Sequence, residues 1–195
     1  MANRNSAGFG LIPTRVLGQG PATAGFGQYW IDAGDSTAIY NGEAVYSAVG
    51  SILGAQGSAT AVTLGVLQGV FYNAATTIKP TWSNYYPGGI TPTGGGLISA
   101  FVYDDPNKLF EIQGSAILAK TAAVGKNTDI LLAQGNTING QSATQMNTAF
   151  PPAAASAQLR IVGFSTDPEN SDPLTANANW IVRINEHVYS RATGV

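Results

Sequence analysis

Residues 97–113, LISAFVYDDPNKLFEIQ, carry the pattern that decides the fold class of this chain. Two apolar and β-prone runs, 97–103 and 108–113, flank the tetrapeptide DDPN. That tetrapeptide is typical of a turn, because Asp and Asn accept local backbone hydrogen bonds and Pro fixes φ. In the second run Phe110 and Ile112 alternate with Glu111 and Gln113, as in a strand with one buried face. The stretch therefore predicts two strands joined by a short turn, with Phe110 and Ile112 facing a core.

Short runs of the same kind recur along the chain, and we expect further strands at residues 29–33, 37–40, 43–49, 62–72, 158–164 and 180–189. In the run 62–72, VTLGVLQGVFY, Gly65 and Gly69 indicate a bulge or a sharp bend. The best helical segment is 115–125, which Gly125 would end after one to two turns. Together these signals predict an all-β protein. We expect a jelly-roll-like β-sandwich or barrel of about eight short strands with one short helix.

Residues 1–28 differ from this pattern, and we predict an N-terminal arm there, followed by a single β-rich domain at residues 29–195. The stretch 8–27 is rich in Gly and holds two Pro residues, so it has few ways to pair as a regular element. Its apolar residues, among them Phe9, Leu11 and Ile12, are nevertheless unsuited to a solvated tail. Two interpretations stay open: the arm lies over its own core, or it packs on a neighbouring subunit.

Charge is scarce in this chain. Only 10% of the residues are Asp, Glu, Lys or Arg, against about 25% in a typical soluble domain. A surface with so little charge is expected to lie against other protein, so the composition favours a structural protein over a catalyst. The nine Lys and Arg residues are scattered and the net charge is −2. Both facts argue against binding to nucleic acid or to an anionic membrane.

Cysteine is absent, which excludes disulfides and thiolate chemistry. No apolar run approaches the length of about 18 residues that would indicate a membrane span. The opening residues MANRNSAGFG lack the apolar segment of a secretory signal peptide. We therefore expect the chain to be made and assembled in the cytoplasm.

Few residues are candidates for catalysis or metal binding. The one histidine, His187, follows Glu186 in a strand-like run, where neighbours point to opposite faces, so a structural role is favoured over a catalytic triad. Asp104, Asp105 and Glu111 form the best carboxylate group. A capped turn is favoured there over calcium binding or a pair of catalytic carboxylates. We predict no enzyme activity, no cofactor and no metal site.

Trp82, Tyr85 and Tyr86 form the densest aromatic cluster, within the Pro- and Gly-rich segment 79–96. Aromatic side chains of this kind pack into cores, anchor protein interfaces, or stack on sugars and bases. The sequence leaves a core role, an interface and a sugar platform open.

Several segments resemble a family of small virion proteins, the head decoration (cement) proteins of tailed bacteriophages. The resemblance begins with GFGLIPTRVLG at 8–18 and YWIDAGDSTAIYNGEAV at 29–45. It continues through KPTWSNYYPGG at 79–89 and VYDDPNKLFEIQ at 102–113, the most specific part. VGKNTDIL at 124–131, LRIVGFSTDPEN at 159–170 and NWIVRINEHVYS at 179–190 complete it. It covers most of the chain in order and departs mainly at 50–61 and 134–156.

The resemblance implies a non-enzymatic protein on the exterior of an icosahedral phage head. Its partners would be a separate major capsid protein and further copies of itself, with a trimer favoured and a dimer possible. The expected location is the virion, after assembly in the host cytoplasm. The alternative is a virion-surface module for glycan binding or host attachment. The residues we expect at interfaces are Phe9, Leu11, Ile12, Arg15, Val16, Trp82, Tyr85 and Tyr86.

Overall fold

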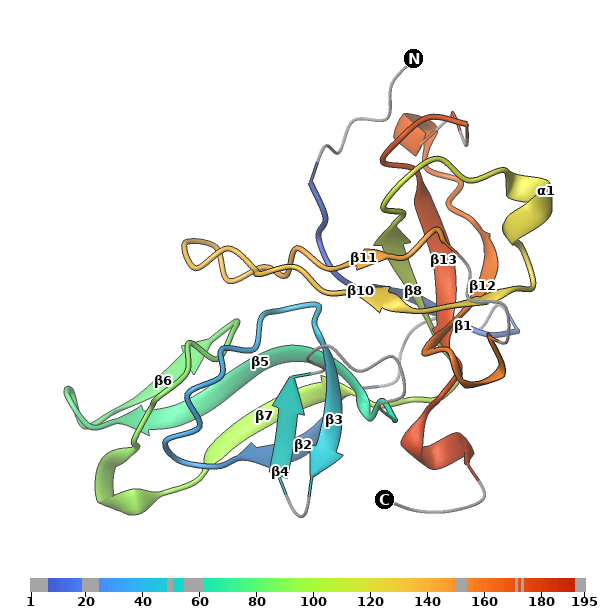
Figure 1. Cartoon of the computed structure of the whole chain (residues 1–195). Coiled ribbons are helices and arrows are strands. Elements are labelled where there is room, and N and C mark those ends of the chain that lie inside the picture. Colours follow the sequence, from blue (N-terminus) through green and yellow to red (C-terminus); the bar gives the residue numbers. More distant parts are fainter. Residues whose placement is uncertain are drawn as a thin grey trace.

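The computed structural model describes residues 7–18, 25–48, 51–54, 62–149, 154–170, 172 and 174–191. Within these residues the chain is all-β, as the sequence predicts, and its curled antiparallel sheets form a half-barrel. Figure 1 shows two sheets in separate halves of the molecule, which we call sheet A and sheet B, and a small strand pair beside them.

Sheet A has five strands in the order β1-β8-β13-β12-β9. Their bounds are Ile12–Val16 (β1), Lys108–Gln113 (β8), Asn179–Ile184 (β13), Leu159–Phe164 (β12) and Asn127–Thr128 (β9). Alternate residues of the three inner strands point to one side, where they form a buried core. This core includes Phe110, Ile112, Leu159, Ile161, Trp180 and Val182.

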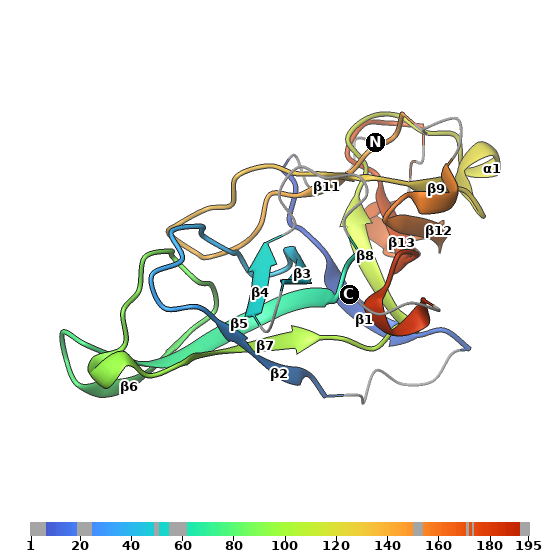
Figure 2. The same cartoon turned by 60° about the horizontal axis from the view of Figure 1, so that its bottom comes forward.

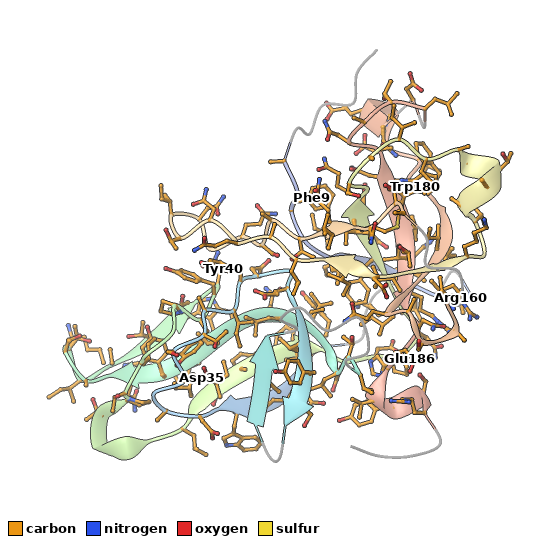
Figure 3. The ribbon with its side chains drawn as sticks, viewed as in Figure 1. Phe9, Asp35, Tyr40, Arg160, Trp180 and Glu186 are labelled. Atoms are coloured by element: carbon orange, nitrogen blue, oxygen red, sulfur yellow. The ribbon has the colours of Figure 1, made fainter. Side chains whose placement is uncertain are left out.

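Sheet B has six strands, in the order β2-β7-β5-β3-β4 with β6 paired to β5. Their bounds are Gly27–Ile31 (β2), Ile98–Tyr103 (β7), Gly65–Ala74 (β5), Ala44–Ala48 (β3), Ser51–Gly54 (β4) and Lys79–Ser83 (β6). A second core covers its inner face and includes Ile31, Val45, Leu67, Val70, Ile98 and Val102. In Figure 3, Trp180 lies in the half formed by sheet A and Asp35 in the half formed by sheet B.

The stretch 97–113 joins the two sheets. It forms β7 and β8 with the predicted turn between them; β7 lies between β2 and β5, and β8 lies between β1 and β13. The turn is closed at Asp105, whose carbonyl accepts the Lys108 N–H and whose Oδ1 accepts the Asn107 N–H. Phe110 and Ile112 are fully buried, which confirms the predicted strand phase.

A long loop, residues 132–144, connects β10 (Ile130–Leu131) to β11 (Gln145–Met146) and reaches from sheet A towards sheet B (Figures 1 and 2). The Asn41 N–H donates to the Gly140 carbonyl at 2.9 Å. The Tyr85 hydroxyl donates to the Thr137 carbonyl at 3.2 Å. We call this segment the bridging loop, because its own strands pair beside sheet A while its tip bonds to residues of the other half.

The described part of the predicted N-terminal arm belongs to the fold. Residues 12–16 form β1, which pairs with β8, and residues 27 and 28 begin β2. Ahead of β1, the Gly10 N–H donates to the Thr144 carbonyl and the Leu11 N–H to the Gly42 carbonyl, and Leu11 is fully buried. Residues 8–16 therefore lie over the chain's own core, which is the first of the two interpretations left open by the sequence. Residues 1–6 and 19–24 lie outside the described residues.

Three expected elements are shorter than the sequence predicts. The helix is confined to α1, Lys120–Ala123, because residues 114 and 115 pair with Met146 instead of starting a helix. The last strand ends at Ile184 and is followed by a 3-10 turn, Val188–Ser190. Residues 37–40 contribute one bridge, between Ile39 and Tyr86. The two-residue strands β9, β10 and β11 raise the number of strands in the described residues to thirteen.

Two glycines in β5 allow its neighbours to approach closely. The pairing of β5 with β7 shifts register between Leu67 and Gly69, so the bulge indicated by the sequence is present. A Cβ at Gly65 would clash with the backbone carbonyl of Tyr103. A Cβ at Gly69 would lie 2.7 Å from Cζ2 of Trp82. Both positions exclude a side chain because of contacts across the sheet, and neither has the positive φ that would itself demand glycine.

Replacing Phe110 by Ala should lower the free energy of unfolding by about 3–5 kcal/mol, because the change leaves a cavity in the core of sheet A. Urea unfolding followed by circular dichroism measures this loss. Ile138, which is almost fully exposed in the bridging loop, supplies the control, and Ile138→Ala should change stability by less than about 0.5 kcal/mol. Equal losses for the two variants would contradict the assigned core.

Gly65→Ala should destabilise the protein by about 1–3 kcal/mol, since the added methyl group overlaps the Tyr103 carbonyl and the strands must separate. Gly163→Ala is the matched control, because Gly163 also lies in a strand and a Cβ there meets no atom within 4 Å. The control should leave stability unchanged or raise it by up to about 1 kcal/mol. Thermal unfolding of both variants tests this, and a stable Gly65→Ala protein would refute the close approach.

Candidate functional site

The predicted interface residues of the N-terminal segment divide between the surface and the core. Ile12 and Arg15 are exposed on β1, an edge strand, and Phe9 and Val16 are half-buried. Leu11 is a correction: its side chain is part of the core of sheet A and presents no surface to a neighbour. Its apolar character, which suggested a contact with another subunit, serves this chain's own packing.

The predicted aromatic cluster is also divided. Trp82 is 51% exposed on β6. Tyr85 stacks on the ring of Tyr40, with 5.6 Å between the ring centroids. Tyr86 is a second correction, because it is fully buried and its hydroxyl donates to the Asp35 carbonyl at 2.6 Å. The three side chains therefore do not form a common platform.

Instead, Trp82 belongs to a larger group of aromatic side chains on the outer face of sheet B. We call this surface the aromatic face; it comprises Phe26, Trp30, Phe71, Trp82, Phe101 and Tyr103. Its strands all lie in the lower half of Figure 1. Sequence reasoning missed all its members except Trp82, because they come from four strands that are distant in the sequence.

The sheet register explains why these side chains meet. Trp30 of β2 pairs with Ser99 of β7, Ser99 pairs with Phe71 of β5, and Phe71 pairs with Trp82 of β6. Directly paired residues point to the same side of a sheet, so this row crosses four strands on one face. Trp30, Phe71 and Trp82 are 43%, 40% and 51% exposed.

A second line of ring contacts supports the row. Phe101 lies between Phe26 and Trp82, with centroid separations of 5.4 Å and 5.2 Å. The Trp82 indole also covers Gly69, the residue paired with Phe101, so the absence of a side chain there gives the indole its place. These contacts fix ring positions before any partner binds.

The aromatic face carries little charge: at its edge the Lys108 ammonium group lies 5.2 Å from the centroid of the Tyr103 ring. The six strands of sheet B contain one charged residue, Lys79 at the start of β6. Gln28 and Ser99 supply polar groups on the same side, joined by a hydrogen bond of 3.0 Å. A surface of this kind suits a partner that is itself uncharged over the contact.

The residues considered for catalysis lie in two separate places, with His187 near Asp104 and Glu111 elsewhere. His187 is buried; its Nδ1 accepts the Tyr189 N–H, and its Nε2 has no partner among the described residues. Burial lowers the pKa of His187 and therefore favours the neutral ring. Asp104 accepts a hydrogen bond of 2.7 Å from the Tyr29 hydroxyl, whose pKa is raised chiefly by burial. These contacts hold the junction between β2, β7 and the residues after β13.

Glu111 lies elsewhere, at a cleft of about 770 Å³ on the outer side of sheet A. We call it the amide cleft, because five of its lining residues are amides: Gln134, Asn136, Asn139, Gln141 and Asn179. Glu111, Asp167 and Phe9 line it as well, and Asp104 does not. Figure 3 shows Phe9 on the N-terminal segment, close to β8.

A second cleft, of about 780 Å³, contains a buried carboxyl group. Glu43 lines it together with Ser36, Thr37 and Tyr40. Burial raises the pKa of Glu43 to about 7, although the Tyr40 N–H donates to its Oε2 at 2.8 Å and acts in the opposite direction. A carboxyl group whose pKa is raised to near neutral pH is common at functional sites and also occurs at purely structural positions.

Among the described residues no group of three or more His, Cys, Asp or Glu side chains could hold a metal ion. No helix in the described part of the chain is long and apolar enough to cross a membrane. Comparisons with protein-family models, with curated proteins and with solved structures found no match to this chain.

Glu43 should make stability depend on pH. Its pKa rises from 4.5 in the unfolded chain to about 7 in the fold, so the folded state binds the proton more tightly. The contribution of Glu43 to the free energy of unfolding is therefore most favourable below about pH 4.5, and it falls as the pH rises towards 7 and above. The shift corresponds to about 3 kcal/mol.

The variant Glu43→Gln should remove this dependence and raise stability at alkaline pH by about 2–3 kcal/mol, because the amide can accept the Tyr40 N–H without becoming charged. Urea midpoints of both proteins across the pH range test it. Glu111→Gln is the comparison variant, since Glu111 lies at a cleft but has a partly exposed side chain. Parallel pH curves for wild type and Glu43→Gln would disprove the assignment.

Proposed function

We propose that this chain is a non-enzymatic capsid decoration protein that binds the exterior of an icosahedral phage head through its aromatic face. The observation that carries the proposal is a row across four strands of sheet B in which three strands present an exposed aromatic side chain, Trp30, Phe71 and Trp82. The partner, a major capsid protein, follows from the family that the sequence resembles.

The composition of the aromatic face supports a protein partner. Protein interfaces are enriched in Trp, Tyr and Phe and depleted of charge at their centres. Aromatic residues bury large areas with few rotatable bonds, so a contact made by Trp30, Phe71 and Trp82 loses little side-chain entropy. The ring contacts of Phe101 with Phe26 and Trp82 lower that cost further, because the rings are already packed.

Self-association is the second part of the proposal, with a trimer favoured and a dimer possible. β1 is an edge strand of sheet A, and Ile12, Arg15 and Leu17 are exposed on or beside it. Edge strands with exposed apolar side chains are ready contacts for another chain. Repeated weak contacts on a symmetric shell gain from effective concentration, so each single contact can be modest.

The alternative of a glycan-binding module loses the platform on which it was based, because Tyr85 and Tyr86 pack within the chain. A hydrolase that uses Asp104 and Glu111 is also disfavoured, since Asp104 bonds to Tyr29 and does not line the cleft at Glu111. Both findings leave a binding role through the aromatic face as the better supported function.

Trp30→Ala and Trp82→Ala should each weaken binding to capsids assembled without this protein by at least about tenfold, because aromatic residues at the centre of an interface carry much of its free energy. Binding isotherms from co-sedimentation measure the effect. Ile138→Ala, which removes an exposed apolar side chain of the bridging loop, should bind like the wild type. Point variants are preferable to deletion of the N-terminal segment, since that deletion removes β1 and Leu11 from sheet A.

Circular dichroism and urea unfolding of each variant confirm that the fold is intact. Wild-type affinity of a folded Trp30→Ala, Trp82→Ala double variant would overturn the aromatic face as the docking surface. A light-scattering mass of the purified protein tests the trimer separately.

A further inference from the structure

The amide cleft is a preformed hollow. Its rim is the bridging loop, whose tip is closed by bonds from the Asn136 N–H to the Gln141 carbonyl and from the Gly140 N–H to the Asn136 carbonyl. On the opposite side, Gln141 Nε2 donates to the Phe9 carbonyl at 3.3 Å. The two walls are therefore tied to each other by the chain's own hydrogen bonds and need no ligand to form.

The floor of the cleft comes from the outer face of sheet A. Glu111 of β8 and Asn179 of β13 lie there on neighbouring strands, two residues apart in register because Asn179 pairs with Gln113, and Asn179 Nδ2 donates to Glu111 Oε1 at 3.0 Å. A second hollow, of about 270 Å³, adjoins it; both are lined by Glu111 and Asp167. The two hollows therefore share a wall that carries two carboxylate groups.

We propose that the amide cleft is a binding site for a neutral oligosaccharide. Its lining residues offer amide N–H donors and amide or carboxylate acceptors side by side, which matches sugar hydroxyls because each hydroxyl both donates and accepts. Phe9 adds an apolar patch for the C–H face of a sugar ring. The volume of about 770 Å³ lies in the range of small-molecule sites.

The charges on these walls select against anions. Glu111 and Asp167 are acidic, and Arg15 is the single Lys, Arg or His among the described residues that line the two hollows. A phosphate, sulfate or uronic acid would meet a net negative wall. A neutral chain of hydroxyl groups meets no such repulsion, and carboxylates accept hydrogen bonds from adjacent hydroxyls strongly.

The floor of the cleft is held rigidly at Asn179. Asn179 is held from two sides, since its Nδ2 bonds to Glu111 and its backbone N–H donates to Asn170 Oδ1 at 2.7 Å. Its Oδ1 is buried and has no partner among the described residues. Because this atom is closed to solvent, a ligand hydroxyl reaches it only if the neighbouring side chains move, and the open amides of the bridging loop supply the direct contacts.

This site does not depend on capsid binding through the aromatic face, although Ile12 and Arg15, which line the two hollows, also lie on the edge strand proposed for self-association. The amide cleft uses the outer face of sheet A and the bridging loop, whereas the aromatic face uses β2, β5, β6 and β7 of sheet B. A decoration protein with this cleft would carry a sugar-binding surface besides the one that contacts the shell.

The test is a titration of the full-length, ¹⁵N-labelled protein with cellotetraose, maltotetraose, mannotetraose and N,N′,N″,N‴-tetraacetylchitotetraose. Sulfated and uronic-acid oligosaccharides of equal length form a second arm. We expect at least one neutral tetrasaccharide to bind with millimolar or better affinity and to shift the backbone amides of Phe9, Asn179 and residues 134–143. The acidic oligosaccharides should bind at least tenfold more weakly.

Variants assign the binding to the cleft. Gln134→Ala and Asn139→Ala change exposed side chains of the bridging loop, and Glu111→Gln retains the shape of the side chain. Their combination should weaken binding at least tenfold while the unfolding curve keeps its shape. Trp82→Ala is the matched control and should bind the sugar like the wild type. Absence of shifts with all neutral tetrasaccharides, stronger binding of the acidic ones, or shifts centred on Trp30, Phe71 and Trp82 would each overturn the proposal.

Discussion

The turn at residues 104–107 is the constraint on which the arrangement of the two sheets depends. It carries the chain from the interior of sheet B to the interior of sheet A, and it also binds the first strand of each. The Asp104 carboxylate accepts the Tyr29 hydroxyl of β2, and the Asn107 carbonyl accepts the N–H of Leu17, directly after β1. Both sheets are thereby fixed to one short segment. The turn therefore also sets the positions of the amide cleft and the aromatic face, because the floor of the cleft includes β8 and the aromatic face includes β7.

The parts of the fold that could be predicted from the sequence are those with a strong local pattern. The alternation in 108–113 and the DDPN turn define β8 and its buried residues without knowledge of any partner strand. β1 could not be recognised in this way. Its pairing with β8 spans about a hundred residues of sequence, and its short run contains Pro13, which cannot donate to a ladder. The predicted helix is shorter than expected for the opposite reason. Local propensity was adequate, but the bond from Ser115 to Met146 holds the start of the segment in an extended conformation.

The candidate sites show the same limit. Trp82, Tyr85 and Tyr86 are close in sequence but lie in different environments. Trp82 is on the surface, Tyr85 stacks on Tyr40, and Tyr86 is in the core of sheet B. The aromatic face assembles only when the order of four strands and the bulge at Gly69 are known, since a register shift of one residue moves a side chain to the other side of a sheet. The amide cleft likewise requires the bridging loop to be placed against the N-terminal segment, a contact between residues more than a hundred positions apart.

The near absence of charge in the strands of sheet B has a kinetic consequence. Oppositely charged surfaces steer partners together and can raise association rates to about 10⁸–10⁹ M⁻¹s⁻¹ at low salt, whereas uncharged ones associate at about 10⁵–10⁶ M⁻¹s⁻¹. A contact made by Trp30, Phe71 and Trp82 belongs to the second class. A partner that docks there would arrive slowly, at a rate that ionic strength scarcely alters, and the affinity of the complex would depend on how slowly it dissociates.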